Sequence, residues 1–156
     1  MSVEARIAEL GLTLPPAARP VAAYVPALRV GDLVFVSGQV PMRDGSPGWL
    51  GRVGDDVDVE SAAEAARTCG LQGLAALKDV IGDLDLVRRV VRLGVFVASA
   101  PGFTGQPQVA NGASELLQEV FGEAGRHARA AVGVAELPLG VCVEVEFIFE
   151  VEPAAG

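Results

Sequence analysis

HARAAVGVAELPLGVCVEVEFIFEV, residues 127 to 151, contains two segments that have the pattern of β-strands but differ in character. In the second segment every odd position from Val141 to Val151 is apolar, while Glu144 and Glu146 occupy even positions. Such alternation is typical of a strand that buries one face in a hydrophobic core. The second segment therefore indicates which side of a sheet is core, and its other side carries carboxylates.

The first segment begins with an arginine among very small residues. Arg129 is followed at every second position by Ala131 and Gly133, so the strand face that it occupies leaves space beside it. An arginine with space around it favours a bidentate contact with a ligand carboxylate. The alternative is an interface arginine that pairs with a glutamate of another subunit.

The two segments are expected to pair as a hairpin that turns within residues 137–140, Leu-Pro-Leu-Gly. In that register Arg129 lies opposite Ile148 and Gly133 lies opposite Glu144, which places the arginine and the glutamate on one sheet face. About four residues of strand, or ~13 Å, would separate the two charged groups. A ligand or a neighbouring subunit would have to close that gap.

Apolar periodicity along the rest of the chain predicts further strands and helices. Helices are expected over residues 3–10, from a capping box at Ser61 and Glu64 to Val80, and from Pro107 to Phe121, while strands are expected over residues 23–29, 33–39 and 88–99. The first two of these strands flank a turn at residues 30–32, and the glycine-rich residues 42–58 are expected to form a long loop. This order predicts an α+β fold with two long helices on one sheet face, and the mixed character of the other face favours a cyclic oligomer.

Length and composition favour one domain. The chain has 156 residues with 51% hydrophobic content, and a main body over residues 21–152 is expected to follow an N-terminal helix and an extended lead-in over residues 1–20, which includes Pro20. The formal charge of -8 and the lack of a dense Lys/Arg cluster argue against a nucleic-acid partner. No segment has the character of a membrane span or a secretory signal, so we expect a soluble cytoplasmic protein without a membrane partner.

Cysteine and histidine are too sparse to indicate a metal site. Cys69 and Cys142 are isolated within apolar patterns and are expected to be buried thiols. His127 is the only histidine and has no partner at metal-ligand spacing, so it is interpreted as a residue at the rim of the space around Arg129.

Two motifs carry a resemblance to a known family. ARAAVGVAELPLGVCVEVE, residues 128–146, together with VSGQVP, residues 36–41, resembles the Rid family, also called the YjgF-like or L-PSP proteins. The resemblance extends from Ala22 to Val151 in one consistent order of elements. It implies a chorismate-mutase-like α+β fold, a homotrimer whose sheets form a central barrel, and ligand clefts between subunits.

The resemblance also implies an activity. Many family members hydrolyse reactive enamines and imines derived from amino acids, of the 2-iminobutanoate and 2-iminopropanoate type, to a 2-keto acid and ammonia. They use no metal or organic cofactor. The expected ligand is therefore a small molecule that bears a carboxylate.

The family's functional positions fall on particular residues of this sequence. Its carboxylate-binding arginine corresponds to Arg129 and its water-positioning glutamate to Glu144, which without the resemblance would be read as a solvent-facing strand residue. The other expected substrate-binding residues are Tyr24, Ser37, Gly38, Asn111 and Ala131, with the backbone N–H groups of Ser37 and Gly38 as donors.

Departures from the family pattern surround the expected cleft. His127 stands where proline or alanine is usual, and Ala131 stands where many active deaminases carry a cysteine. Pro26 replaces a common glutamine, and Glu136 replaces a common arginine. These positions bear on the identity of the substrate.

Three functions from different classes follow from the sequence. The leading hypothesis is a cofactor-free imine/enamine deaminase in which Arg129 binds the carboxylate and Glu144 positions water. The second is a non-catalytic trimer that binds a small carboxylate. The third is an endoribonuclease, which the charge of -8 and the lack of a paired histidine disfavour.

Overall fold

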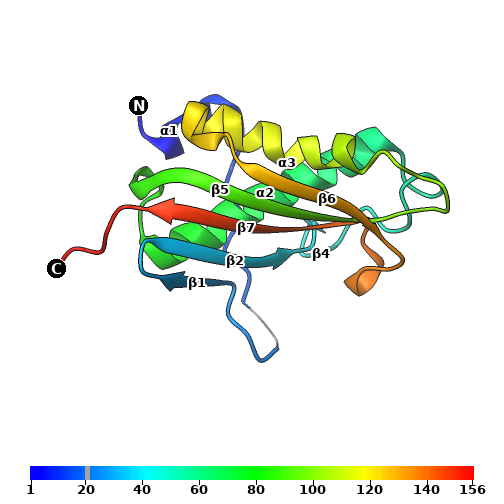
Figure 1. Ribbon diagram of the computed structural model, residues 1–156, viewed down its shortest axis with the longest axis horizontal. Coiled ribbons are helices and arrows are strands. Elements are labelled where there is room, and N and C mark those ends of the chain that lie inside the picture. The colour runs from blue at the N-terminus through cyan, green and yellow to red at the C-terminus, as the bar shows by residue number, and fades with distance from the viewer. Residues whose placement is uncertain (20–21) are drawn as a thin grey trace.

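The computed structural model describes residues 1–19 and 22–156, and Figure 1 shows a twisted sheet with two long helices behind it. Pro20, expected within the lead-in, lies outside the described residues. The helices are α1 (Val3–Glu9), α2 (Val59–Ile81) and α3 (Gln106–Phe121), with short 3-10 helices at Leu84–Leu86, Gly122–Gly125 and Pro138–Gly140. The strands are β1 (Ala27–Val30), β2 (Leu33–Gln39), β3 (Met42–Arg43), β4 (Ser46–Pro47), β5 (Val87–Ala98), β6 (Ala128–Val134) and β7 (Val143–Val151).

The main sheet has the strand order β1-β2-β7-β5-β6. β1 and β2 form the expected hairpin, with Gly31 in the left-handed region (φ 62°) at the turn. β2 and β5 both pair with β7 in antiparallel orientation, while β6 pairs with β5 in parallel. β3 and β4 form a separate small hairpin within the loop expected over residues 42–58. The mixed sheet and its helices confirm the predicted α+β class.

The predicted hairpin between β6 and β7 is wrong, because β5 lies between these two strands. In β5 the run from Leu93 to Ala98 has no polar side chain and is buried except at the half-buried Phe96, as is typical of a strand with neighbours on both edges. Parallel strands such as β5 and β6 need a crossover connection, which α3 supplies. Residues 135–142 then carry the chain from β6, past β5, to β7.

The strand register places Arg129 and Glu144 on opposite faces of the sheet. Arg129 is the partner of Leu93, which is the partner of Phe147, so these three side chains share one face. Glu144 pairs with Phe96 on the other face. Arg129 thus aligns with Phe147 and not with Ile148, and this shift of one residue reverses the face. The expectation that Arg129 and Glu144 share a face, ~13 Å apart, is therefore wrong.

Glycines allow close contacts among α2, α3 and the sheet. Gly73 of α2 faces the ring of Phe147 in β7, where an added Cβ would lie 2.5 Å from Cε2. Gly112 of α3 lies against the backbone of Ala63 in α2, where an added Cβ would lie 2.7 Å from the carbonyl carbon. α2 therefore packs on the face of the sheet that carries both Phe147 and Arg129, and this is the core face.

α2 begins earlier than the sequence predicts. Its N-cap is Asp58, whose carboxylate accepts a hydrogen bond from the N–H of Ser61 at 2.7 Å. The capping box expected at Ser61 and Glu64 is wrong, because Asp58 caps the same helix one turn earlier. Val80, expected on the buried face, is 40% exposed near the end of the helix. No helix within the described ranges is long and apolar enough to cross a membrane.

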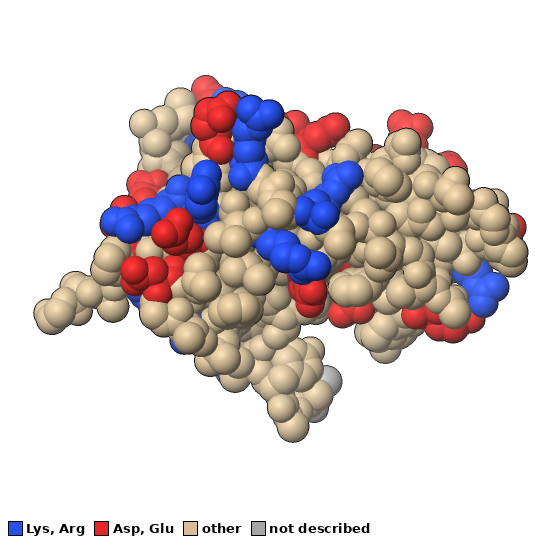
Figure 2. All heavy atoms as spheres, viewed as in Figure 1, with Lys and Arg blue, Asp and Glu red and all other residues tan. Residues whose placement is uncertain are grey.

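The sheet face opposite α2 and α3 exposes large apolar side chains. Leu28 and Val30 of β1 are 55% and 57% exposed, Phe35 of β2 is 42% exposed, and Val132 of β6 is 46% exposed. Figure 2 shows this face, where the surface over β1 and β2 is largely free of charged side chains. We refer to it as the open face of the sheet.

The contact between α2 and α3 leads to a stability prediction. We expect Gly112→Ala to lower the free energy of unfolding by about 1–3 kcal/mol, although alanine favours a helix over glycine by about 1 kcal/mol. The reason is that the new methyl group meets the Ala63 backbone, which cannot move aside. Urea denaturation measures the change.

Gly70→Ala is the matched control, because an added Cβ there meets first the flexible end of Leu116, at 2.7 Å. It is expected to destabilise less than Gly112→Ala. An equal or larger loss at Gly70 would contradict the assignment of Gly112 to a backbone contact.

Candidate functional site

Arg129 lies on the edge strand β6 with its guanidinium held by α3. Its Nη1 donates to Asn111 Oδ1 at 2.8 Å and to Ser114 Oγ at 3.1 Å. Asn111 and Ser114 are three residues apart on α3 and therefore share one side of that helix. Within residues 1–19 and 22–156, no carboxylate oxygen lies within 4.0 Å of the guanidinium nitrogens. The Nε and Nη2 edge of Arg129 thus has no acidic partner in the described chain.

His127 lies next to this cluster. Its Nδ1 is 2.6 Å from the carbonyl oxygen of Gly125, and its Nε2 is 2.9 Å from Ser114 Oγ. Burial lowers the pKa of His127, the bond to Gly125 opposes this shift, and the nearby charge of Arg129 adds to it. His127 is half-buried and contacts the arginine cluster through Ser114, and its expected place at the rim stays a prediction.

The small residues that follow Arg129 are packed against the protein. An added Cβ at Gly133 would lie 2.9 Å from Nε2 of Gln106 and 3.0 Å from Oγ of Ser99. Gln106 in turn donates to Ser99 Oγ at 3.2 Å. The space at Gly133 therefore admits a side chain of α3, and the expectation of open space there is wrong. Ala131 is half-buried and packs against the hydrophobic core.

Glu144 lies on the open face of the sheet, next to Gly38. An added Cβ at Gly38 would lie 2.9 Å from Cδ of Glu144, so only glycine leaves room for this carboxylate. Burial raises the pKa of Glu144, and the neighbouring Glu146 raises it further. Glu146 is paired with Arg92, Nη1 to Oε1 at 3.4 Å. The raised pKa makes Glu144 a stronger proton acceptor than an ordinary glutamate.

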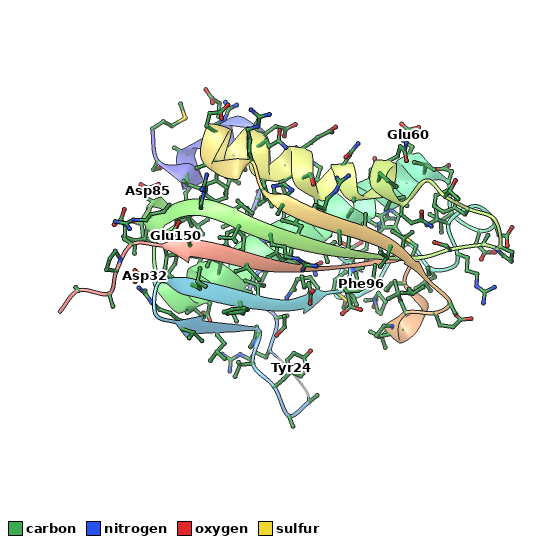
Figure 3. All side chains as sticks on the ribbon, viewed as in Figure 1. Tyr24, Asp32, Glu60, Asp85, Phe96 and Glu150 are labelled. Carbon is green, nitrogen blue, oxygen red and sulfur yellow. The ribbon has the colours of Figure 1, made fainter. Side chains whose placement is uncertain are left out.

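Ser37 fixes the segment that carries Tyr24. Its Oγ donates to the carbonyl of Val25 at 2.6 Å, and its N–H donates to the carbonyl of Pro26 at 2.8 Å. The expectation that the Ser37 N–H would donate to a ligand is wrong, because Pro26 already accepts from it. For Gly38 this role stays a prediction. Tyr24 is 56% exposed, and Figure 3 shows it on the loop that projects beyond β1.

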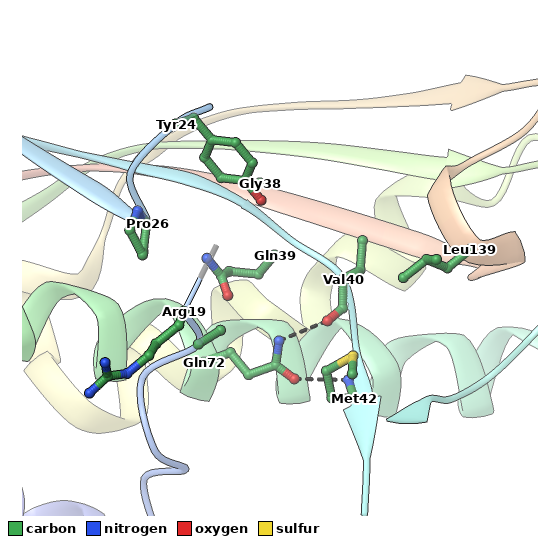
Figure 4. Close-up of a pocket in the computed structure, with 10 residues that line it drawn as sticks. Arg19, Tyr24, Pro26, Gly38, Gln39, Val40, Met42, Gln72 and Leu139 are labelled. Atoms are coloured by element: carbon green, nitrogen blue, oxygen red, sulfur yellow. Dashed lines mark hydrogen bonds between the residues drawn. The ribbon is translucent and has the colours of Figure 1, made fainter. Parts of the chain in front are cut away.

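Tyr24 borders two hollows on the surface. The first, of about 240 Å³, is also lined by Gly38 and Leu139, and Figure 4 shows Tyr24 above Gly38 within it. Its floor is fixed by Gln72 of α2, which donates to the carbonyl of Val40 at 2.8 Å. The second, of about 570 Å³, is lined by residues of the open face, namely Leu28, Phe35, Ser37, Arg92, Glu146 and Ile148.

The loop over residues 42–58 is tied to the connection between β6 and β7. Arg52 forms an ion pair with Glu136, Nη2 to Oε1 at 2.6 Å. The N–H of Cys142 donates to the carbonyl of Trp49 at 3.0 Å. Glu136, where the family commonly has an arginine, is thus one of the contacts between this loop and the β6–β7 connection.

The predicted site residues form two separate clusters in one chain. The first cluster, at the edge strand β6, consists of Arg129 and Asn111. The second cluster consists of Tyr24, Ser37, Gly38 and Glu144. Sequence reasoning missed Ser114, although its spacing of three residues from Asn111 was a usable signal. In the part of the chain that the structure describes, no group of three or more His, Cys, Asp or Glu side chains could hold a metal ion.

The sheet order and the helices place the chain in the YjgF/chorismate-mutase-like class of α+β proteins. The sequence profile of the family described as "YjgF/chorismate_mutase-like, putative endoribonuclease" matches residues 4–151. The chain belongs to this YjgF-like, or Rid, family, as the sequence motifs predicted.

Relatives of known sequence or structure extend over most of the chain. Protein TCP17 of Trypanosoma cruzi is 48% identical over 95% of this chain and 93% of its own length. The crystal structure of Atu1372 from Agrobacterium tumefaciens, a protein of unknown function, has a TM-score of 0.90 and 49% identity over 97% of this chain and 94% of its own. A 2-iminobutanoate/2-iminopropanoate deaminase of Dermatophagoides farinae is 29% identical over 90% of this chain and 95% of its own.

The lowered pKa of His127 predicts how stability depends on pH. In the folded state the pKa lies below about 6.5, so below that pH the unfolded chain binds a proton that the folded chain does not. The stabilisation that neutral His127 gives to the folded state is fully present above about pH 6.5, and it is lost as the pH falls towards the folded-state pKa. Urea denaturation should therefore show that the free energy of unfolding decreases as the pH is lowered through this range.

His127→Gln is the comparison, because glutamine does not titrate and all other groups are shared. The difference between the two proteins in free energy of unfolding should change with pH in this window. Parallel curves for the two proteins would show that His127 titrates alike in the folded and unfolded states.

Proposed function

We propose that the protein is a cofactor-free deaminase that hydrolyses small imines bearing a carboxylate, and the enamines that tautomerise to them, to 2-keto acids and ammonia. The observation that carries this proposal is the arginine cluster. Arg129 is held by Asn111 at 2.8 Å and Ser114 at 3.1 Å through one nitrogen, and no described carboxylate pairs with its other edge. Family membership and the deaminase of Dermatophagoides farinae, at 29% identity, support the reaction type.

Arg129 binds the substrate carboxylate in this proposal. Nη1 uses its two hydrogens on Asn111 and Ser114, which leaves Nε–H and one Nη2–H to donate side by side. Such a pair of parallel donors fits a carboxylate and fixes the orientation of the substrate. A lysine could not reproduce this geometry because its ammonium is a single point charge.

Glu144 positions and deprotonates the attacking water. Burial raises its pKa above that of an ordinary glutamate, and its carboxylate accepts a proton as the water oxygen bonds to the imine carbon. The protonated glutamic acid then returns the proton to the nitrogen, which gives a carbinolamine. Glu144 next accepts the proton of the new hydroxyl group and passes it to the amine, so that the C–N bond breaks as the C=O bond forms and ammonia leaves. One water is consumed, and the products are the 2-keto acid and ammonia. Every proton is accounted for without an oxidant or a reductant.

The two clusters must come from different subunits for this chemistry. Arg129 and Glu144 lie on opposite faces of one sheet, so a substrate bound to Arg129 cannot meet Glu144 of the same chain across the sheet. A homotrimer that packs the open face of its sheets together would bring the edge strand of one subunit to the glutamate of the next. The exposed apolar residues Leu28, Val30 and Phe35 favour such an interface.

A substitution of Arg129 tests the proposed activity directly. We expect Arg129→Ala to lower kcat/KM for imine hydrolysis by about 100-fold or more, because two charge-assisted hydrogen bonds to the substrate are lost. The imines are generated by an amino-acid oxidase, and their decay is followed together with the ammonia released. Arg129→Lys should stay well below the wild-type rate.

The same variant separates the candidate functions. A non-catalytic carboxylate-binding protein would leave imine decay at the uncatalysed rate in the wild type, while Arg129→Ala would still abolish binding of 2-oxobutanoate. RNA cleavage by the pure wild-type protein, lost in Arg129→Ala, would instead support an endoribonuclease.

Subunit complementation tests the shared site. Glu144→Gln should lower kcat by about 100-fold or more through loss of the proton acceptor, and Arg129→Ala should be similarly inactive. When the two variants are unfolded together in equal amounts and refolded, about a quarter of the interfaces of a random trimer combine an intact Arg129 with an intact Glu144 of the neighbour. Activity should therefore return to about a quarter of the wild-type value.

Each variant refolded alone serves as the control and should regain no activity. Light scattering verifies that the mixed protein is a trimer. No recovery in mixed trimers would show that a single chain supplies both residues or that neither has the proposed role.

A further inference from the structure

We propose that Ser114 and His127 are positioning residues for Arg129: a directed chain of hydrogen bonds from the guanidinium through Ser114 and His127 to the backbone sets the orientation in which Arg129 meets a ligand carboxylate. This inference rests on the proposed role of Arg129 in binding the substrate. It assigns a function to two side chains that take no part in the chemistry itself.

The direction of the chain follows from its last member. The carbonyl oxygen of Gly125 can only accept, so Nδ1 of His127, 2.6 Å away, carries the proton. In a neutral imidazole Nε2 is then the acceptor, and the hydroxyl of Ser114 donates to it at 2.9 Å. A lone pair of the Ser114 oxygen is left to accept from Nη1 of Arg129 at 3.1 Å. Each group thus has one defined role.

The surroundings of His127 favour this neutral form. Its burial and the nearby guanidinium of Arg129 both lower its pKa, and only the bond to Gly125 raises it. Without His127 the Ser114 hydroxyl is free to rotate and to donate to a carbonyl of its own helix, as serine in a helix commonly does. His127 therefore fixes the rotation of the hydroxyl that receives Arg129.

The chain of hydrogen bonds joins the exposed Arg129 to a buried part of α3. The residue is exposed on an edge strand, while Ser114 is only 5% exposed in α3. Asn111 supplies a second contact to the same nitrogen, Nη1, at 2.8 Å. Two acceptors on one nitrogen hold the plane of the guanidinium and turn its Nε–Nη2 edge towards the ligand. The rotational freedom that Arg129 would lose on binding is thus lost beforehand.

Two substitutions at position 127 test the two ring nitrogens of the histidine separately. In His127→Gln the amide oxygen reaches the place of Nε2 and can still accept from Ser114. In His127→Asn the shorter amide reproduces only Nδ1 and its bond to Gly125. The two variants are close in size and polarity, but only His127→Gln keeps the hydrogen bond with Ser114. Ser114→Ala removes the same hydrogen bond by removing the hydroxyl group.

The primary measurement is the dissociation constant for 2-oxobutanoate by isothermal titration calorimetry. We expect His127→Asn and Ser114→Ala to weaken binding by about 3- to 10-fold, the range for loss of one hydrogen bond, while His127→Gln stays within about 2-fold of wild type. In imine hydrolysis the same factor should appear in KM with kcat nearly unchanged, because Arg129 holds substrate and transition state alike. Thermal denaturation identifies any variant that is not folded.

The outcomes distinguish this inference from the proposed function. If Arg129→Ala binds 2-oxobutanoate as well as wild type does, the proposed role of Arg129 fails. If Arg129→Ala loses binding but His127→Asn, His127→Gln and wild type bind equally, the positioning role fails and His127 only supports the fold. Equal losses in His127→Asn and His127→Gln would also overturn the role assigned to Nε2.

A spectroscopic measurement on the unmodified protein tests the direction of the chain independently of any variant. His127 is the only histidine in the sequence, so its ring nitrogens give unambiguous ¹⁵N NMR signals. We expect a protonated Nδ1 and an unprotonated Nε2 at neutral pH. The opposite tautomer, or a charged ring, would contradict the proposed chain.

Discussion

The parallel pairing of β5 with β6 is the constraint on which the rest of the site depends. Parallel strands cannot be joined by a turn, so the chain must leave β5, cross as α3 and return to start β6. This crossover lays α3 beside the edge strand, and Asn111 and Ser114 thereby reach Arg129. The pairing also leaves β7 on the other side of β5, which separates the arginine from the glutamate.

Burial then gives the two clusters different chemical characters. It raises the pKa of Glu144, where the carboxylate is the charged form, and lowers the pKa of His127, where the imidazolium is the charged form. One cause therefore makes the carboxylate a stronger proton acceptor and the imidazole a weaker one. The lowered pKa of His127 works against a second positive charge beside the Arg129 guanidinium.

The sequence predicts local structure well and strand order poorly. The alternation in β7 correctly identifies its core face, since Val143, Val145, Phe147, Phe149 and Val151 are all buried. The eight residues from 135 to 142 are compatible with a hairpin or with a connection past another strand, and nothing local decides between them. The second half of β5 favours the connection, because the run from Leu93 to Ala98 has no polar side chain and is buried except at Phe96, as is typical of a strand with neighbours on both edges. Asn111 was assigned by resemblance, whereas Ser114 has no local signal beyond its spacing.

The departures from the family pattern leave Arg129 and Glu144 in place and change residues around them. Glu136, in place of an arginine, pairs with Arg52 and holds a neighbouring loop. His127, in place of proline or alanine, lies with Nε2 2.9 Å from Ser114 Oγ and so adds a polar contact to the residue that holds Arg129. A proline or an alanine offers no polar side-chain atom there, so the second partner of the Ser114 hydroxyl depends on the histidine. The substitution at position 127 therefore changes the surroundings of the hydrogen bond from Arg129 to Ser114, whereas the substitution at position 136 acts on a loop.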